Sequence, residues 1–84
     1  MSNQTVTPER KREEVTIFIN DERRVAPKPV MTGAEIKALG NIPQQSRLFK
    51  EEPGVHPDKL ISDSESVELK NGDKFYDLPP GVVG

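Results

Sequence analysis

The stretch Val15-Thr16-Ile17-Phe18-Ile19-Asn20 decides how this chain starts to fold. Its three β-branched apolar residues recur at period two, which predicts a strand with one apolar face. Asn20-Asp21-Glu22 has the composition of a tight turn, and residues 23–26 predict a returning strand that completes a hairpin. Pro27 and Pro29 follow directly and restrict the second strand to a short length or to the edge of a sheet.

A short helix is predicted after the hairpin. Thr32-Gly33-Ala34-Glu35 fits a capping box, in which the Thr32 hydroxyl accepts from the amide of Glu35 and the Glu35 carboxylate accepts from the amide of Thr32. Ile36 and Leu39 lie three positions apart on one face, and Gly40-Asn41 supplies a left-handed stop. The helix is therefore about two turns long, and so short a helix is stable only when it packs on a sheet.

After the helix, an extended segment is predicted at residues 46–50 and a last strand at residues 74–76, and residues 60–61 and 67–69 give two further apolar points between them. Asn71-Gly72 is a strong hairpin dipeptide before the last of them. Because Pro79-Pro80 removes two backbone donors, that last strand must end near Leu78. A hairpin, one short helix and then two or three short strands predict an α+β domain of the β-grasp type, with a mixed four- to five-stranded sheet and one short helix packed across it.

The sequence divides into three parts. Residues 1–14 carry scattered apolar side chains and a charge run of mixed sign, which predicts a disordered N-terminal tail. Residues 15–78 form the predicted domain, and residues 79–84 form an extended C-terminal tail. The four residues after Pro80 extend at most about 13 Å and end on Gly84, which presents a carboxylate on a residue without a side chain. Such a carboxylate suits entry into a narrow enzyme tunnel.

The composition excludes several functional classes. A chain of 84 residues holds one modest core, and it has no cysteine for a disulfide, a thiolate metal site or a thiol nucleophile. Twelve basic and 14 acidic residues give a formal charge of −2, so no basic excess favours nucleic acid. The sequence has no secretory signal pattern and no apolar run long enough to span a bilayer, so we expect a cytoplasmic protein with no membrane partner.

No catalytic constellation is visible in the sequence, and we expect neither enzyme activity nor a cofactor. The single histidine, His56, lies in a loop rich in proline and glycine without a cluster of metal ligands, so a solvated side chain is expected there. Asp63, Glu65 and Glu68 are explained by positions in a turn and on the surface of a strand. No metal site is expected.

Three blocks carry a family resemblance: residues 15–20, Met31-Thr32-Gly33-Ala34-Glu35-Ile36, and residues 63–76 with the hairpin dipeptide between Leu69 and Lys74. In this order and spacing, the chain resembles bacterial ubiquitin-like proteins of the multi-ubiquitin domain type over roughly residues 14–84. The resemblance implies a β-grasp fold and a conjugation operon with genes for an activating enzyme, a conjugating enzyme and a metal-dependent deconjugating peptidase. Many members carry several such domains in tandem, whereas this chain carries one.

The resemblance implies a protein modifier that is joined to a target protein through Gly84. The activating enzyme would adenylate the Gly84 carboxylate and take the acyl group as a thioester, and after transfer to the conjugating enzyme a target amine would form an isopeptide bond. Recognition of the tail is assigned to Pro79, Pro80, Gly81, Val82 and Val83, because restricted residues lose less entropy on entering a tunnel. Val83 stands where many such modifiers have a second glycine, so dedicated partner enzymes are expected rather than diglycine-specific ones.

Phe18, Leu48 and Phe49 are candidates for an apolar docking patch. Phe18 falls on the strand face opposite its apolar neighbours, where it either contacts a partner or is covered by a loop or by the N-terminal tail. Surface lysines are normal for solubility, but each of the following is a candidate acceptor for a second modifier: Lys11, Lys28, Lys37, Lys50, Lys59, Lys70 and Lys74.

Two other functions stay open. A sulfur carrier shares the fold and the terminal adenylation but forms a thiocarboxylate, so the mass of the intact chain separates it from a conjugated modifier. A noncovalent module would pair an exposed edge strand with a partner, and it would work normally with Gly84 blocked.

Overall fold

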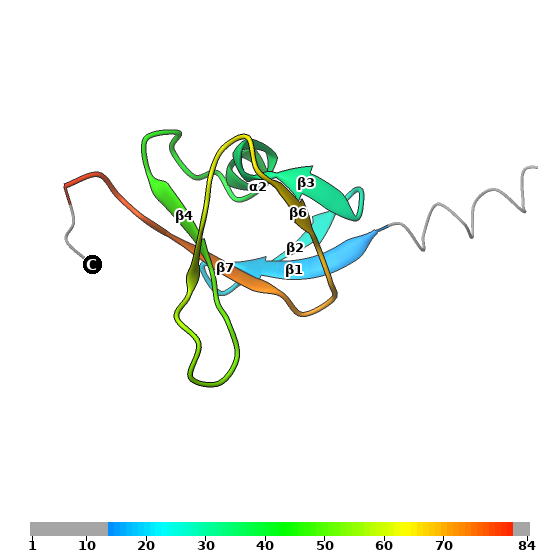
Figure 1. The fold of residues 1–84 in the computed structure, drawn as a ribbon. Coiled ribbons are helices and arrows are strands. Elements are labelled where there is room, and N and C mark those ends of the chain that lie inside the picture. Colours follow the sequence, from blue (N-terminus) through cyan, green and yellow to red (C-terminus); the bar gives the residue numbers. More distant parts are fainter. Residues whose placement is uncertain (1–13, 82–84) are drawn as a thin grey trace, which may run out of the picture.

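The computed structural model describes residues 14–81, which form two sheets and a short helix (Figure 1). Five strands form the larger sheet in the order β2-β1-β7-β4-β5, and β3 pairs with β6 in a second sheet. Since β1 and β7 run parallel while the other neighbours run antiparallel, the larger sheet is mixed, as predicted for a β-grasp. In chain order, the elements are β1 (Val15–Ile19), β2 (Glu22–Ala26), β3 (Val30–Thr32), α2 (Gly33–Leu39), β4 (Arg47–Lys50), β5 (Lys59–Ile61), β6 (Ser66–Glu68) and β7 (Lys74–Leu78).

The predicted hairpin is formed by β1 and β2. Its register runs without interruption from Val15 opposite Ala26 to Ile19 opposite Glu22. The two residues between the strands, Asn20 and Asp21, have φ angles of 53° and 67°, which a type I′ turn requires of both central residues. Among the described residues β2 has no neighbour on its other side, so the edge position predicted from the prolines is confirmed.

The helix α2 begins with the predicted capping box. The amide of Glu35 donates to Thr32 Oγ1 at 3.2 Å, and Glu35 Oε1 accepts from the amide of Thr32 at 2.9 Å. Asn41 provides the left-handed residue after the helix, with a φ of 58°, while Gly40 keeps a φ of −95°. Within residues 14–81 no helix is long and apolar enough to cross a membrane.

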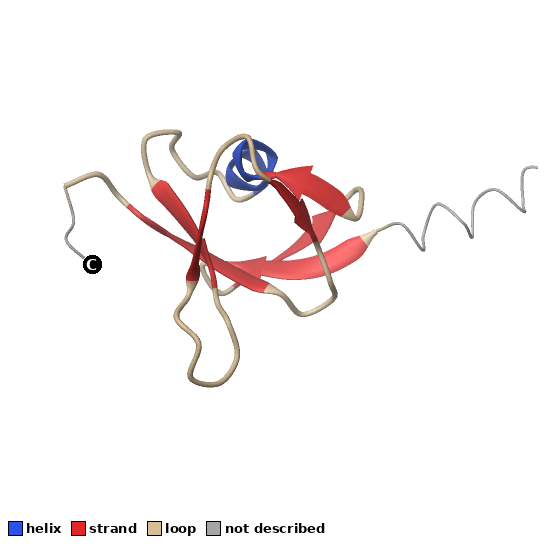
Figure 2. Cartoon of the chain, viewed as in Figure 1, coloured by secondary structure: helices blue, strands red, loops and turns tan. Residues whose placement is uncertain are grey.

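The helix α2 lies over one face of the larger sheet (Figure 2). The core includes buried side chains of α2 and of this sheet, together with Met31 of β3 and Val67 of β6. Its largest fully buried side chains are Ile17 and Ile19 of β1, Ile36 of α2, Leu48 of β4 and Phe75 of β7. Complete burial stabilises side chains of this size by about 1.5–3 kcal/mol each relative to exposure. The packing of Ile36 therefore supplies the stability that a seven-residue helix lacks by itself.

The hairpin predicted at Asn71-Gly72 is wrong. The strand before this dipeptide, β6, pairs with β3, whereas the strand after it, β7, pairs with β1 and β4 of the larger sheet. The dipeptide instead docks on the start of β1: Asn71 Oδ1 accepts from the amide of Thr16 at 2.8 Å, and the amide of Gly72 donates to the Thr16 carbonyl at 2.8 Å. The turn thus carries the chain from one sheet to the other.

Candidate functional site

The C-terminal segment leaves the molecule from the middle of the larger sheet. β7 lies between β1 and β4, and Leu78 is its last paired residue, opposite Arg47. Pro79, Pro80 and Gly81 follow and are exposed. The end of the last strand at Leu78 confirms the prediction made from the two prolines.

Gly81 has a φ of +89°, a backbone conformation that residues with a side chain rarely adopt. Glycine is therefore favoured at this position by the path of the chain. Val82 and Val83, assigned to tail recognition, and Gly84, assigned to conjugation, lie outside the described residues, and their roles stay predictions.

The base of this segment is held by a side-chain clasp between Asn20 and Asp77. Asn20 Nδ2 donates to Asp77 Oδ1 at 2.8 Å, and the backbone amide of Asp77 donates to Asn20 Oδ1 at 3.3 Å. Because Asn20 belongs to the turn between β1 and β2, the clasp ties that turn to the residue just before the end of β7. It fixes the point from which the tail starts.

The predicted docking patch needs one correction, which concerns Leu48. Leu48 has no exposed surface and lies in the core, so it cannot contact a partner. Its neighbour in β4, Phe49, projects from the opposite face, because successive side chains of a strand alternate. Phe18 and Phe49 are both half-buried on this outer face of the sheet, which α2 does not cover.

Two residues that the sequence did not single out complete an apolar row on the outer face. Tyr76 of β7 and Leu60 of β5 lie directly opposite Phe49 on its two sides. The rings of Phe49 and Tyr76 stack with centroids 5.4 Å apart, and Leu60 is 53% exposed. We call Tyr76, Phe49 and Leu60 the outer apolar row; the alternation that buries Phe75 is the signal that could have assigned Tyr76 to it.

Tyr76 also fastens the long connection between β4 and β5. Its hydroxyl donates to Asp58 Oδ2 at 2.7 Å, while Asp58 Oδ1 accepts from the amide of Glu52 at 3.1 Å. The hydrogen bond to the carboxylate raises the pKa of Tyr76 to about 12. The hydrogen bonds from the Tyr76 hydroxyl and then from the Glu52 amide lower the pKa of Asp58.

The candidate acceptor lysines fall into different environments. The prediction of Lys37 as a candidate acceptor is wrong, because its side chain is only 7% exposed. Its Nζ lies 2.8 Å from Asp63 Oδ1 and donates to the Gln44 carbonyl at 3.0 Å. A buried, bonded amine is not available to a partner enzyme. Lys50 is partly covered, Lys11 lies outside the described residues, and the exposed candidates are Lys28, Lys59, Lys70 and Lys74.

Of the three acidic side chains considered in the sequence, Asp63 and Glu65 form ion pairs and Glu68 lies at the surface. Asp63 pairs with Lys37, and Glu65 Oε2 lies 2.8 Å from Lys59 Nζ. Glu68 is exposed on β6, as expected for the surface of a strand, and His56 is exposed in its loop. Within residues 14–81 no group of three or more histidine, cysteine, aspartate or glutamate side chains could hold a metal ion.

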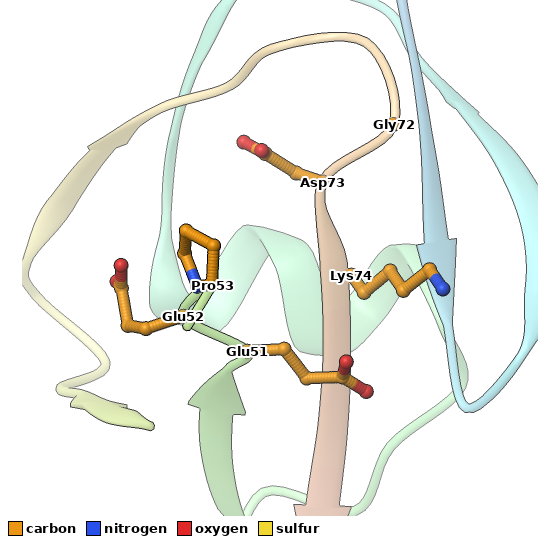
Figure 3. Close-up of a pocket in the computed structure, with 6 residues that line it drawn as sticks. All are labelled: Glu51, Glu52, Pro53, Gly72, Asp73 and Lys74. Carbon is orange, nitrogen blue, oxygen red and sulfur yellow. The ribbon is translucent and has the colours of Figure 1, made fainter. Parts of the chain in front are cut away.

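A shallow hollow of about 240 Å³ lies where β4 ends and β7 begins (Figure 3). Four of its six lining residues carry charge, and it contains neither a histidine nor a hydroxyl side chain. Apolar walls with a few converging polar groups are typical of small-molecule sites, and this hollow lacks them. It is lined by Glu51, Glu52, Pro53, Gly72, Asp73 and Lys74.

Comparison with known proteins agrees with the fold. A model of the multiubiquitin family matches residues 15–76, which is well over half of the chain, and the match ends inside β7. No match was found among curated proteins or among solved structures. With a mixed five-stranded sheet, one short helix and a family match that spans both, the chain belongs to the multiubiquitin family of ubiquitin-like domains.

Proposed function

We propose that the protein is a ubiquitin-like modifier that is joined to a target amine through the carboxylate of Gly84. The observation that carries this proposal is the path of the chain at its end. The central strand β7 ends at Leu78. The clasp between Asn20 and Asp77 holds this end of the strand, and the exposed residues 79–81 continue from it. Membership of the multiubiquitin family supports the same function.

The chemistry must begin with activation, because the leaving group of a free carboxylate would be oxide. Attack of the Gly84 carboxylate on the α-phosphate of ATP releases pyrophosphate and forms an acyl-adenylate. A cysteine thiolate of the activating enzyme displaces AMP, and a cysteine of the conjugating enzyme then takes over the thioester. A lysine amine of the target displaces that thiolate and forms the isopeptide bond, which a deconjugating metallopeptidase hydrolyses. Because the cycle consumes ATP, we propose that it takes place in the cytoplasm of a bacterium that encodes these partner enzymes.

Partner enzymes dock, in this proposal, on the outer face of the sheet. Phe18 and the outer apolar row supply apolar surface on β7, which leads into the tail, on its neighbours β1 and β4, and on β5. Phe18→Ala is expected to weaken binding to the activating enzyme while the melting temperature changes little. A collapse of the melting temperature would instead assign Phe18 to the support of the fold.

Removal of Gly84 tests the proposed function. With the ubiquitin-type activating enzyme from the same genome, the intact chain should support exchange of pyrophosphate into ATP, and the chain without Gly84 should not. A chain extended by one alanine after Gly84 is the matched control, since it keeps every native residue and displaces only the carboxylate. Unchanged exchange with either variant contradicts the proposal. A terminal sulfur in the intact mass would identify a sulfur carrier.

A further inference from the structure

The edge strand β2 presents a row of free backbone groups, which the hydrogen bonds of its neighbour β1 identify. The amide of Phe18 donates to the Asp73 carbonyl at 2.8 Å, and the Thr16 carbonyl accepts from the amide of Gly72 at 2.8 Å. The backbone groups of Thr16 and Phe18 therefore face β7, and those of the alternate residues of β1 face β2. Those alternate residues pair with Glu22, Arg24 and Ala26.

The backbone groups of Arg23 and Val25 consequently point away from the sheet. Each residue offers one amide and one carbonyl, so two donors and two acceptors alternate along the edge. Pairing with β1 is continuous over all five residues of β2, which leaves no bulge, and the strand contains no proline. Val25 is 43% exposed, and no described segment pairs with this edge. Among residues 14–81, charged side chains protect the edge of β2, and Pro27 follows directly after the strand.

The charges on β2 indicate which kind of strand can pair with it. Arg24 is bound to Glu22 at 2.7 Å, whereas Arg23 is exposed and forms no ion pair among the described residues. If the β2 strands of two copies paired antiparallel, arginines would come to lie opposite or next to arginines, and like charges across strands are destabilising. A second copy is therefore a poor occupant, and an acidic strand is a good one.

We propose that β2 binds an extended acidic segment of a partner protein by strand addition. On the outer face, an acidic side chain of the partner lies opposite Arg23, and an apolar side chain two positions away lies opposite Val25. Main-chain hydrogen bonds to these two residues give the affinity, and the two side chains give the specificity. Because β2 is separated from β7 by β1, this site leaves the tail free. It serves a protein that recognises the modifier, whether or not Gly84 is conjugated.

The experiment uses the full chain and a synthetic peptide in which aspartate and valine alternate on one face, with threonine at the positions between them. Backbone amide shifts and protection from hydrogen exchange report where the peptide binds. We expect the largest effects at Arg23 and Val25. A peptide with lysine in place of each aspartate is the charge control. It should bind at least about tenfold more weakly, because it loses at least one charged hydrogen bond to Arg23 and the loss of one such bond lowers the affinity by about that factor.

Two variants test the two parts of the proposal. Val25→Pro removes an outward amide that pairing with β1 does not use, and it should lower the affinity about tenfold. Arg23→Glu should lower the affinity for the aspartate peptide and raise it for the lysine peptide. Lys70→Glu makes the same change of charge at an exposed site outside β2, and it should leave both affinities unchanged.

Several results would overturn the proposal. The proposal is wrong if the aspartate peptide at millimolar concentration causes no change in the backbone amide shifts, or if both peptides bind equally well. It is also wrong if the shift changes centre on the outer apolar row. A reversible dimer of the free chain with a protected Val25 amide would assign the edge to a second copy instead. If Val25→Pro prevents folding, Arg23→Glu still tests the proposal, because unchanged affinities for both peptides in that variant would contradict it.

Discussion

Replacement of Asp58 by asparagine should bring the pKa of Tyr76 down from about 12 toward its ordinary value of about 10. The Tyr76 hydroxyl donates to Asp58 Oδ2 at 2.7 Å, so the carboxylate stabilises the proton and opposes formation of the tyrosinate. An amide oxygen still accepts this hydrogen bond but carries no charge. Tyr76 is the only tyrosine and the chain has no tryptophan, so the ultraviolet absorbance of tyrosinate reports this one group.

The sign of the effect on stability follows from the direction of the shift. Since the folded state raises the pKa of Tyr76, the stabilising contribution is complete below about pH 10 and is lost as the pH rises through about 12. The pKa of Asp58 is lowered, so its contribution is complete above the ordinary aspartate pKa and is lost as the pH falls through the lowered value. The pair lies at the surface, where solvent screens it, so Tyr76→Phe should cost only about 1 kcal/mol near neutral pH. That loss corresponds to about 4–8 °C in the melting temperature.

Glu51→Gln is the matched control, because Glu51 acts on Tyr76 through its charge alone and is the weakest of the groups that raise its pKa. It should move the titration much less than Asp58→Asn. A Tyr76 that titrates near pH 10 in the native chain would contradict the hydrogen bond to the Asp58 carboxylate. So would equal shifts in the two variants.

Three further predictions concern stability and are measured by thermal unfolding. Asp63→Ala should destabilise the fold by about 2 kcal/mol, because it leaves the buried ammonium of Lys37 with one carbonyl partner, whereas Lys37→Met should stay within about 1 kcal/mol. Equal costs would contradict the pairing of the exposed Asp63 carboxylate with this buried ammonium. Gly33→Ala should cost about 1–3 kcal/mol even though alanine favours helices, because its Cβ would clash with the backbone carbonyl oxygen of Ser62 in the turn after β5. A neutral effect would contradict this close approach. Leu48→Ala should cost about 2–5 kcal/mol and Leu60→Ala no more than about 0.5, and the reverse order would restore Leu48 to the docking patch.

The parts of the fold that local contacts determine could be predicted from the sequence. The turn at Asn20-Asp21 and the capping box between Thr32 and Glu35 depend on residues at most three positions apart, and both are present. The end of β7 at Leu78 follows equally locally, from the donors that two prolines lack. These signals were enough to establish the hairpin, the helix and the β-grasp order.

Contacts between distant segments limited the rest of the prediction. Leu48-Phe49 places two large apolar residues side by side in a strand, and only the pairing with β7 decides which of them faces the core. Lys37 looks like a surface residue until Asp63, 26 positions later, is brought to it. The three-residue strands β3 and β6 are too short to show a periodic pattern, so the sequence predicts a hairpin at Asn71-Gly72, whereas the dipeptide links the two sheets.

If Gly84 forms an isopeptide bond, as we propose, digestion of the conjugates should release a branched peptide. An N-terminally tagged chain is purified under denaturing conditions from cells that contain its partner enzymes, and it is digested with trypsin. Cleavage after Lys74 would leave residues 75–84 attached to the acceptor lysine, a remnant of defined mass. We predict this remnant on lysines of target proteins from the intact chain, and its loss when Gly84 is deleted. Recovery of the chain only with a free or sulfur-bearing C-terminus, and with no branched peptide, would contradict the claim.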